Sequence, residues 1–213
     1  THAKISTGKA ENKFGVPISD AAAIFARLSA LDGLNLRGVA VHIGSMIADL
    51  TPMELAFQKV GALVGELQSA GRKVVVLTDA NVALSQTEFL TEALADCPRL
   101  VVEAGESTKS LTVLGNVLDF LAAQKVDRGG VLIAVGGGVV GDLGGFAAAA
   151  YLRGIDFYQV PTTLLAMVDS SVGGKTGINL AAGKNLVGAF HQPKRVFIAT
   201  SLLLTLPERL NAR

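Results

Sequence analysis

Hydrophobic positions in the second half of the chain form short buried runs that alternate with amphipathic stretches. Apolar runs of a few residues, rich in valine and isoleucine and bounded by turn residues, predict strands that are buried on both faces. Such runs occur at residues 73–77, 100–102, 131–135 and 157–160. Helical periodicity lies between them, at residues 87–94 and most strongly at 110–123. This alternation predicts an α/β fold of the Rossmann-like, doubly wound kind with a mostly parallel sheet.

The first 70 residues predict a smaller βα arrangement. Ser19 is suited to cap a first helix, and the alternation at residues 39–41 predicts a short strand. Pro52 suits the first turn of a second helix, where its missing backbone donor is harmless. The apolar stripe of this helix comprises Leu55, Val60, Leu63, Val64 and Leu67. Because a new unit begins at Gly71, we expect residues 1–70 and 71–213 to be two pieces.

Composition narrows the classes of partner. The 213 residues include 19 Lys plus Arg and 18 Asp plus Glu, so no basic stripe predicts nucleic-acid binding. Cys97 is the only cysteine, which excludes an intrachain disulfide and favours a reducing, cytoplasmic setting. The 3 histidines show no zinc spacing, and no secretory leader is visible at Thr1, so we predict neither a metal site nor secretion.

Residues 131–152 are nearly uncharged and could be mistaken for a membrane span. They contain six glycines and Asp142, which fit a buried strand, a glycine turn and a close-packed helix better. Gly136, Gly138 and Gly141 supply the pattern G-x-G-x-x-G directly after the predicted strand. Such a turn lets the backbone approach a pyrophosphate at the start of the following helix. The context predicts a nucleotide site at this turn, although packing alone can also produce such glycines.

A second glycine-rich stretch contains cations in otherwise uncharged surroundings. Gly173-Gly174-Lys175-Thr176 resembles the end of a phosphate-binding P-loop, but Asp169 stands where that motif needs glycine, so we reject an ATPase. Lys175, Lys184 and Arg153 are each either ordinary surface charges or part of a site for a small polyanion. As a set they favour the polyanion, with phosphate or carboxylate groups.

Taken together, these motifs resemble those of 3-dehydroquinate synthases. The resemblance is carried by Thr78–Asn81, Gly105–Lys109, Gly136–Asp142, Tyr151–Gly154, Pro161–Ala166, Val168–Asn179, Gly183–Asn185 and Leu204–Pro207. It covers residues 71–213, and it implies the N-terminal NAD-binding domain of an enzyme in the shikimate pathway of aromatic amino acid biosynthesis. That reaction is a carbon–oxygen lyase step, in which a phosphorylated sugar acid loses phosphate and cyclises while NAD is recycled.

The resemblance also implies roles for individual residues. NAD would be bound by Asp79, Asn81, Gly105, Glu106, Lys109, Gly137, Gly138, Val139, Val140, Gly141, Asp142, Thr162, Thr163, Leu204 and Thr205. The phosphorylated substrate would contact Arg153, Lys175, Lys184 and Asn185, with Asp169, Lys175 and Lys184 as the catalytic residues. The family also uses a divalent metal, zinc or cobalt, in a helical C-terminal domain. That domain is expected to be absent from this chain, so we expect the chain alone to be inactive.

The first 70 residues instead resemble diaminopimelate decarboxylase, a pyridoxal-phosphate-dependent TIM barrel. Residues 11–16, 36–39 and 42–45 carry this likeness, which implies that His42 and Ser45 would contact the cofactor. Met46 stands where that family has glutamine, and the Schiff-base lysine and glycine-rich phosphate loop are missing. We therefore expect no pyridoxal phosphate binding, and a βα segment of TIM-barrel origin that serves as scaffold.

Two functional classes follow from these resemblances. The first is an NAD-binding enzyme or enzyme fragment that acts on a phosphorylated small molecule, without nucleic-acid or membrane partners. The second is a recombined or designed α/β chimera that has no catalytic function. The sequence leaves a homo-oligomer open, and also the supply of a metal domain by another chain.

Overall fold

The computed structural model describes residue 27 and residues 51–206. The chain divides into two compact units, Thr1–Asp49 and Leu50–Arg213, and the second contains nearly all of the described residues. The helix predicted after Ser19 and the strand predicted at residues 39–41 lie outside the described residues, as do His42 and Ser45.

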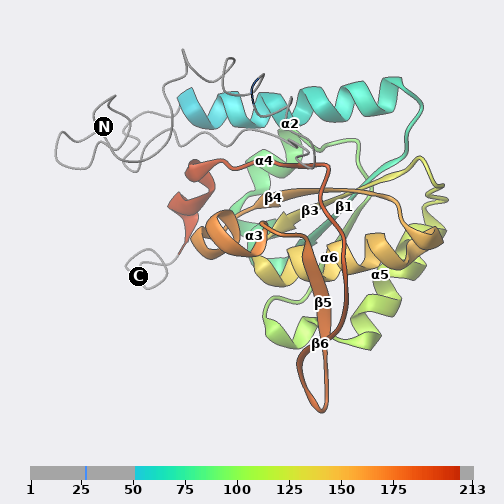
Figure 1. The fold of residues 1–213 in the computed structure, drawn as a ribbon. Coiled ribbons are helices and arrows are strands. Elements are labelled where there is room, and N and C mark those ends of the chain that lie inside the picture. The colour runs from blue at the N-terminus through green and yellow to red at the C-terminus, as the bar shows by residue number, and fades with distance from the viewer. Residues whose placement is uncertain (1–26, 28–50, 207–213) are drawn as a thin grey trace. The chain divides into compact units, whose positions relative to one another are not determined.

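Five strands of the second unit form a parallel sheet, which Figure 1 shows between helical layers. The strands are β1 (Val74–Asp79), β2 (Arg99–Val102), β3 (Val131–Gly136), β4 (Asp156–Pro161) and β7 (Arg195–Val196). Their order is β2-β1-β3-β4-β7, and each neighbouring pair runs parallel. The predicted Rossmann-like, doubly wound class is therefore confirmed.

Helices cover both faces of this sheet (Figure 1). They are α2 (Thr51–Ser69), α3 (Ala80–Ser85), α4 (Thr87–Glu92), α5 (Leu111–Ala123) and α6 (Gly138–Ala150), with the short helical turns η1 (Glu106–Thr108), η2 (Tyr151–Arg153), η3 (Ala166–Ser170) and η4 (Thr200–Thr205). One core lies between the sheet and α2, α4 and η4, and the other lies between the sheet and α5 and α6.

Each strand contributes to both cores, because successive side chains of a strand point to opposite faces. Val74 and Val76 face the α2 side, whereas Val75 and Leu77 face the α6 side. All four side chains are buried, which explains why the strand is a continuous apolar run and not an alternating one.

The order of the strands places a crevice between β1 and β3. From β1 the chain crosses to β2 on one side and then returns to β3 on the other. At such a reversal the connections leave the two neighbouring strands in opposite directions, and ligands of open α/β sheets bind beyond the carboxyl ends of those strands. Asp79 and Gly136 end β1 and β3 at this point.

A second sheet was not predicted from the sequence. It is the antiparallel hairpin of β5 (Lys175–Leu180) and β6 (Gly183–Phe190), which packs against α6. Gly177 faces Gly188 across the hairpin, and a Cβ on Gly188 would lie 2.0 Å from the Thr176 carbonyl oxygen. The strands need these glycines for close backbone approach, and so they lack the valine-rich pattern that marks β-structure.

Glycines also let α6 lie between the sheet and the hairpin. A Cβ on Gly144 would contact Ala134 and Leu77 at 3.1 and 3.3 Å, and one on Gly145 would lie 2.3 Å from Thr176 Cγ2. The small residues of α6 are therefore required by packing on two sides. Within the described part of the chain, no helix is both long and apolar enough to cross a bilayer.

Helix α2 is anchored to the sheet by its predicted apolar stripe. Leu63 is 7% exposed and belongs to the core on that face. Leu63→Ala is expected to lower the free energy of unfolding by about 2–5 kcal/mol, because it removes buried methyl groups and leaves a cavity. Urea denaturation measures the loss. Leu84→Ala is the matched control, since Leu84 is 82% exposed and should change stability little. An unchanged midpoint for Leu63→Ala would contradict the packing role of α2.

Candidate functional site

The glycine turn lies where the sequence predicted it, between the end of β3 and the start of α6. Gly137 is the residue before α6 and provides no side-chain cap for the helix. The backbone N–H groups of the first helical turn are thus available to an anion, and the helix dipole favours negative charge there. The Thr162 N–H donates to the Gly136 carbonyl at 3.0 Å, which ties the end of β4 to the turn.

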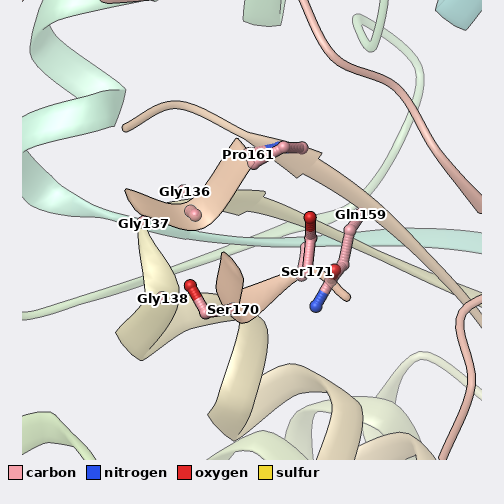
Figure 2. Close-up of a pocket in the computed structure, with 9 residues that line it drawn as sticks. Gly136, Gly137, Gly138, Gln159, Pro161, Ser170 and Ser171 are labelled. Atoms are coloured by element: carbon pink, nitrogen blue, oxygen red, sulfur yellow. The ribbon is translucent and has the colours of Figure 1, made fainter. Parts of the chain in front are cut away.

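Hydroxyl groups surround this turn, as Figure 2 shows for Ser170 beside Gly138. A Cβ on Gly138 would lie 2.9 Å from Ser170 Oγ, and one on Gly137 would lie 3.3 Å from Thr163 Cγ2. The pocket below the turn has a volume of about 10 Å³, room for about one water molecule. A dinucleotide would therefore have to lie on the open side of the turn.

Three polar atoms around this pocket have no hydrogen-bond partner in the described part of the chain. They are Gln159 Oε1, Ser170 Oγ and Ser171 Oγ, and all three are buried. Buried polar atoms in native proteins are nearly always paired with protein, water or ligand. Because the pocket that they line has room for about one water molecule, these buried atoms fit an ordered water and lie out of reach of a dinucleotide on the open side of the turn.

A buried lysine joins the glycine helix to two neighbouring segments. Lys109 is 4% exposed, and its Nζ donates to Asp142 Oδ2 at 2.6 Å and to Asn185 Oδ1. Glu106 Oε1 lies 3.8 Å from the same Nζ. Residues that the resemblance divided between cofactor and substrate therefore form one polar cluster. We call Glu106, Lys109, Asp142, Asn179 and Asn185 the lysine cluster.

Burial controls the charge of Asp142 in this cluster. Desolvation raises the pKa of its carboxyl group above the ordinary value, and this outweighs the lowering by the hydrogen bond and charge of Lys109, while Glu106 adds to the rise. Among the described residues only Oδ2 of Asp142 has a protein partner. The other oxygen, Oδ1, remains for a hydroxyl donor of a ligand.

Asp79 and Asn81 lie at the neighbouring strand end, across the crevice. The Asp79 carboxylate caps α3, because its Oδ1 accepts from the N–H groups of Asn81 and Val82 at 2.9 and 3.0 Å. Asn81 is exposed in the first turn of α3. Asp79 therefore has a structural role in the helix as well as its position at the crevice.

The predicted threonines fall into two groups. Thr162 is buried after β4, and Thr163 Oγ1 accepts from the Ala166 N–H at 3.2 Å, so both lie beside the glycine turn. Leu204 and Thr205 belong to η4, where Leu204 is exposed. Thr205 Oγ1 accepts from Gln86 Nε2 at 2.5 Å, which holds η4 against the junction of α3 and α4.

The predicted substrate cations do not converge within the described residues. Arg153 follows the C-terminus of α6, whereas the glycine turn precedes its N-terminus, about 20 Å away for a helix of 13 residues. Lys175 begins β5 and pairs with Phe190, while Lys184 is the second residue of β6, near the hairpin turn. All three side chains are exposed, as is Asp169 in η3.

Three polar residues of the site were not given roles from the sequence. Asn179 belongs to the lysine cluster, Gln159 lines the pocket below the glycine turn, and Gln86 binds Thr205. A polar residue within an apolar strand, as Gln159 is in β4, was the signal that could have identified one of them. Within the described residues, no group of three His, Cys, Asp or Glu side chains could hold a metal ion.

The parallel sheet, its reversal between β1 and β3 and the glycine turn at that point define a doubly wound, Rossmann-like α/β protein. Comparison with known families narrows the class. Residues 99–212 match the family model described as 3-dehydroquinate synthase N-terminal. The chain belongs to this family. Residues 1–78 match the model of the pyridoxal-dependent decarboxylase, pyridoxal binding domain.

Curated relatives support the same family. A 3-dehydroquinate synthase of Opitutus terrae is 67% identical over 146 residues, which cover 68% of this chain and 40% of that protein. The 3-dehydroquinate synthase of Rhodospirillum rubrum is 49% identical over 180 residues, which cover 83% of this chain and 44% of the relative. The chain thus spans less than half the length of these relatives.

Solved structures agree in fold. A 2-deoxy-scyllo-inosose synthase complexed with carbaglucose-6-phosphate, NAD+ and Co2+ is 34% identical with a TM-score of 0.60, covering 65% of this chain and 39% of that one. A 2-epi-5-epi-valiolone synthase from Streptomyces hygroscopicus with NAD+ and Zn2+ bound is 29% identical with a TM-score of 0.62, covering 82% of this chain and 48% of that one.

Proposed function

We propose that the unit beginning near Leu50 binds NAD as the cofactor-binding part of a 3-dehydroquinate synthase-type enzyme. The observation that carries the proposal is the glycine turn, Gly136–Gly138, which opens α6 at the strand-order reversal and leaves the helix N-terminus without a side-chain cap. Its open N–H groups suit a pyrophosphate. Solved relatives that are described with NAD+ bound support this assignment.

The residues around the turn have distinct tasks in this proposal. Gly137–Gly141 approach the pyrophosphate with backbone alone, and Thr162 and Thr163 border the same turn. Asp142 accepts a ribose or amide donor with Oδ1, while Lys109 holds its Oδ2. At the end of β1, Asp79 and Asn81 would face the adenosine end, as would Gly105 and Glu106 after β2. Val139, Leu204 and Thr205 would complete the surface, whereas Val140, whose side chain is buried in the core, would contribute only its backbone.

For the whole enzyme we propose the phosphate-eliminating cyclisation of a phosphorylated sugar acid. NAD, when bound, would supply reversible hydride transfer. Lys175, Lys184 and Asn185 of the hairpin would bind the anionic substrate, and Asp169 in the exposed η3 segment would accept or orient a proton. Arg153, at the far end of α6, is the least supported of these assignments.

The metal that the resemblance implies is not assigned to described residues. Relatives are described with Co2+ or Zn2+, and a divalent ion is part of the proposal only for the complete enzyme. Pyridoxal phosphate is not proposed either, since Met46 departs from the decarboxylase pattern. We further propose a cytoplasmic setting, with which the free, buried Cys97 is compatible.

A recombined α/β chimera without catalytic function is the second candidate. The match of residues 1–78 to a decarboxylase model favours it. Relatives that align over 83% of the chain extend the synthase likeness upstream of Gly71, because residues 71–213 are only about two thirds of the chain. We therefore propose a boundary near Leu50, where the compact units meet in sequence, in place of one at residue 70.

Calorimetric titration of the chain with NAD tests the proposed function. Saturable binding is expected, and Asp142→Asn should weaken it about tenfold or more, because hydrogen bonds to charged groups contribute about 1.5–3 kcal/mol. Asp119→Asn is the matched control, the same chemical change on an exposed position of α5. Absence of NAD heats from the wild type would favour the non-catalytic chimera. Equal affinity of both variants and the wild type would remove Asp142 from the site.

A further inference from the structure

Asn179 connects the hairpin to the loop that carries Glu106 and Lys109. Its backbone N–H donates to the Lys109 carbonyl at 2.8 Å, and its Nδ2 donates to Glu106 Oε1 at 2.9 Å. Its Oδ1 accepts from the Asn185 N–H at 2.8 Å. One side chain thus bridges β5, the η1 segment and β6.

The local backbone explains why Asn179 can reach these partners. The register of the hairpin shifts between Ile178 and Leu180, so Asn179 lies at an irregularity in the pairing. Such a bulge turns a side chain away from the regular ladder, and bulges are frequent beside active sites. Across from it, Asn185 has a φ of 54°, a left-handed conformation that asparagine tolerates better than most residues.

The three hydrogen bonds of Asn179 hold other members of the lysine cluster in position. Lys109 is held at its carbonyl by Asn179, while its Nζ reaches Asp142 and Asn185. Both polar atoms of the Asn179 side chain have protein partners, so its effect on a ligand would pass through Glu106, Lys109 and Asn185.

We propose that Asn179 is a positioning residue that locks the hairpin to the Glu106 loop and so couples the NAD surface to the substrate surface. The inference rests on the proposed function, because it assigns Lys109 and Asp142 to the cofactor and Asn185 to the substrate. Without the three hydrogen bonds of Asn179, the hairpin carrying Asn185 separates from the loop, and Lys109 loses its fixed position.

Asn179→Asp tests this positioning role with a minimal change of the side chain. The new carboxylate still accepts from the Asn185 N–H, but it cannot donate to Glu106 and repels it. The charged groups facing it are Glu106 and Lys109 of the loop and Asp142 of α6. We expect the Kd for NAD to rise about tenfold at about pH 8, because the variant loses the hydrogen bond to Glu106 and places two carboxylates side by side. Asn116→Asp on the exposed face of α5 should leave the Kd unchanged.

Removing the repulsion provides the second arm. In an E106Q background, Asn179→Asp should raise the Kd by much less than it does in the wild type, since the neutral amide at position 106 can donate to the new carboxylate. An equal effect in both backgrounds, or an affinity of Asn179→Asp that matches the wild type, would overturn the proposal.

Amide hydrogen exchange separates this inference from the proposed function, because it needs no NAD. Asn179→Ala removes the acceptor for the Asn185 N–H, so exchange at Asn185 should accelerate about tenfold or more. Unchanged exchange at Asn185 would contradict the positioning role of Asn179, whether or not the chain binds NAD. Absence of NAD binding by the wild type would instead overturn the proposed function and, with it, the coupling.

Discussion

Replacing Lys109 by methionine is expected to lower the free energy of unfolding by about 3 kcal/mol near neutral pH. The Lys109 side chain is 4% exposed and Asp142 is 21% exposed, so the ion pair is largely removed from water. Methionine fills similar space but leaves the Asp142 carboxylate without its cation and Asn185 Oδ1 without its donor. A buried charge that loses its partner is more costly than the loss of the attraction alone.

The loss should depend on pH. Burial already raises the pKa of Asp142 in the folded protein, and removal of the opposing Lys109 charge would raise it further. The folded variant would then bind a proton more readily than the unfolded chain. Its deficit should therefore be largest at high pH and should shrink as the pH falls through the folded pKa of Asp142.

Urea unfolding at about pH 5 and about pH 8 measures this dependence. Lys59→Met on the exposed face of α2 is the control and should change stability by less than about 0.5 kcal/mol. The double variant Lys109→Met/Asp142→Asn should lose this pH dependence, because it has no carboxyl group at position 142 to titrate. A Lys109→Met protein as stable as the wild type at both pH values would contradict the stabilising role of Lys109 in the cluster.

Gly145→Ala should destabilise the fold by about 1–3 kcal/mol or more, as overpacked cores do. The added methyl would lie 2.3 Å from Thr176 Cγ2 and 3.0 Å from Phe157 Cε1, so α6 would have to move away from the hairpin, the sheet or both. Thermal and urea unfolding give the magnitude. Asn185 of the hairpin accepts a hydrogen bond from Lys109, which also holds Asp142, and NAD affinity should therefore fall as well if the proposed function holds.

Two companion variants make this prediction specific. Gly115→Ala in α5 adds the same methyl where nothing lies within 4 Å, and it should stabilise the protein by up to about 1 kcal/mol through helix propensity. Thr176→Ser removes the clashing methyl but keeps the hydroxyl that donates to the Ala189 carbonyl at 2.7 Å. Combined with Gly145→Ala it should restore much of the stability. Failure of this rescue would place the strain elsewhere.

The sheet could be predicted from the sequence because its signal is local. Every strand predicted between residues 73 and 160 is confirmed within one or two residues. β1, β3 and β4 are almost entirely buried, whereas the edge strand β2 leaves Val101 46% exposed and was still recognisable as a short apolar run. The predicted helix at residues 87–94 is confirmed as α4, whereas α3 was not predicted; Asp79 caps α3, and Gln86 separates it from α4. The cap that Asp79 forms at the end of β1 gives no hydrophobic periodicity from which the start of α3 could be predicted.

The site was only partly predictable. The glycine turn has a fixed spacing after a strand, and the structure has it at the predicted place. The lysine cluster joins residues 76 positions apart, Lys109 and Asn185, and no local pattern indicates that pairing. The lysine cluster forms only when the hairpin is in place, and the glycines of the hairpin predict a loop and not a strand. Sequence motifs thus identified the members of the cluster other than Asn179, while their contacts required the tertiary fold.

The short connection between α2 and β1 has a consequence for engineering. A decarboxylase barrel model extends through residue 78, to the end of β1, while synthase relatives align upstream of Gly71, so a helix followed by a buried strand suits both architectures. Donor segments from barrels could be grafted at this connection in a shuffled library. The graft should preserve Arg72, which donates to Asp156 of β4 at 2.5 Å and to the Gly129 carbonyl at 2.6 Å. Because this ion pair is partly exposed, libraries that randomise the position should lose about 1 kcal/mol of stability or less, and those that exchange only the solvent-facing side of α2 should lose little.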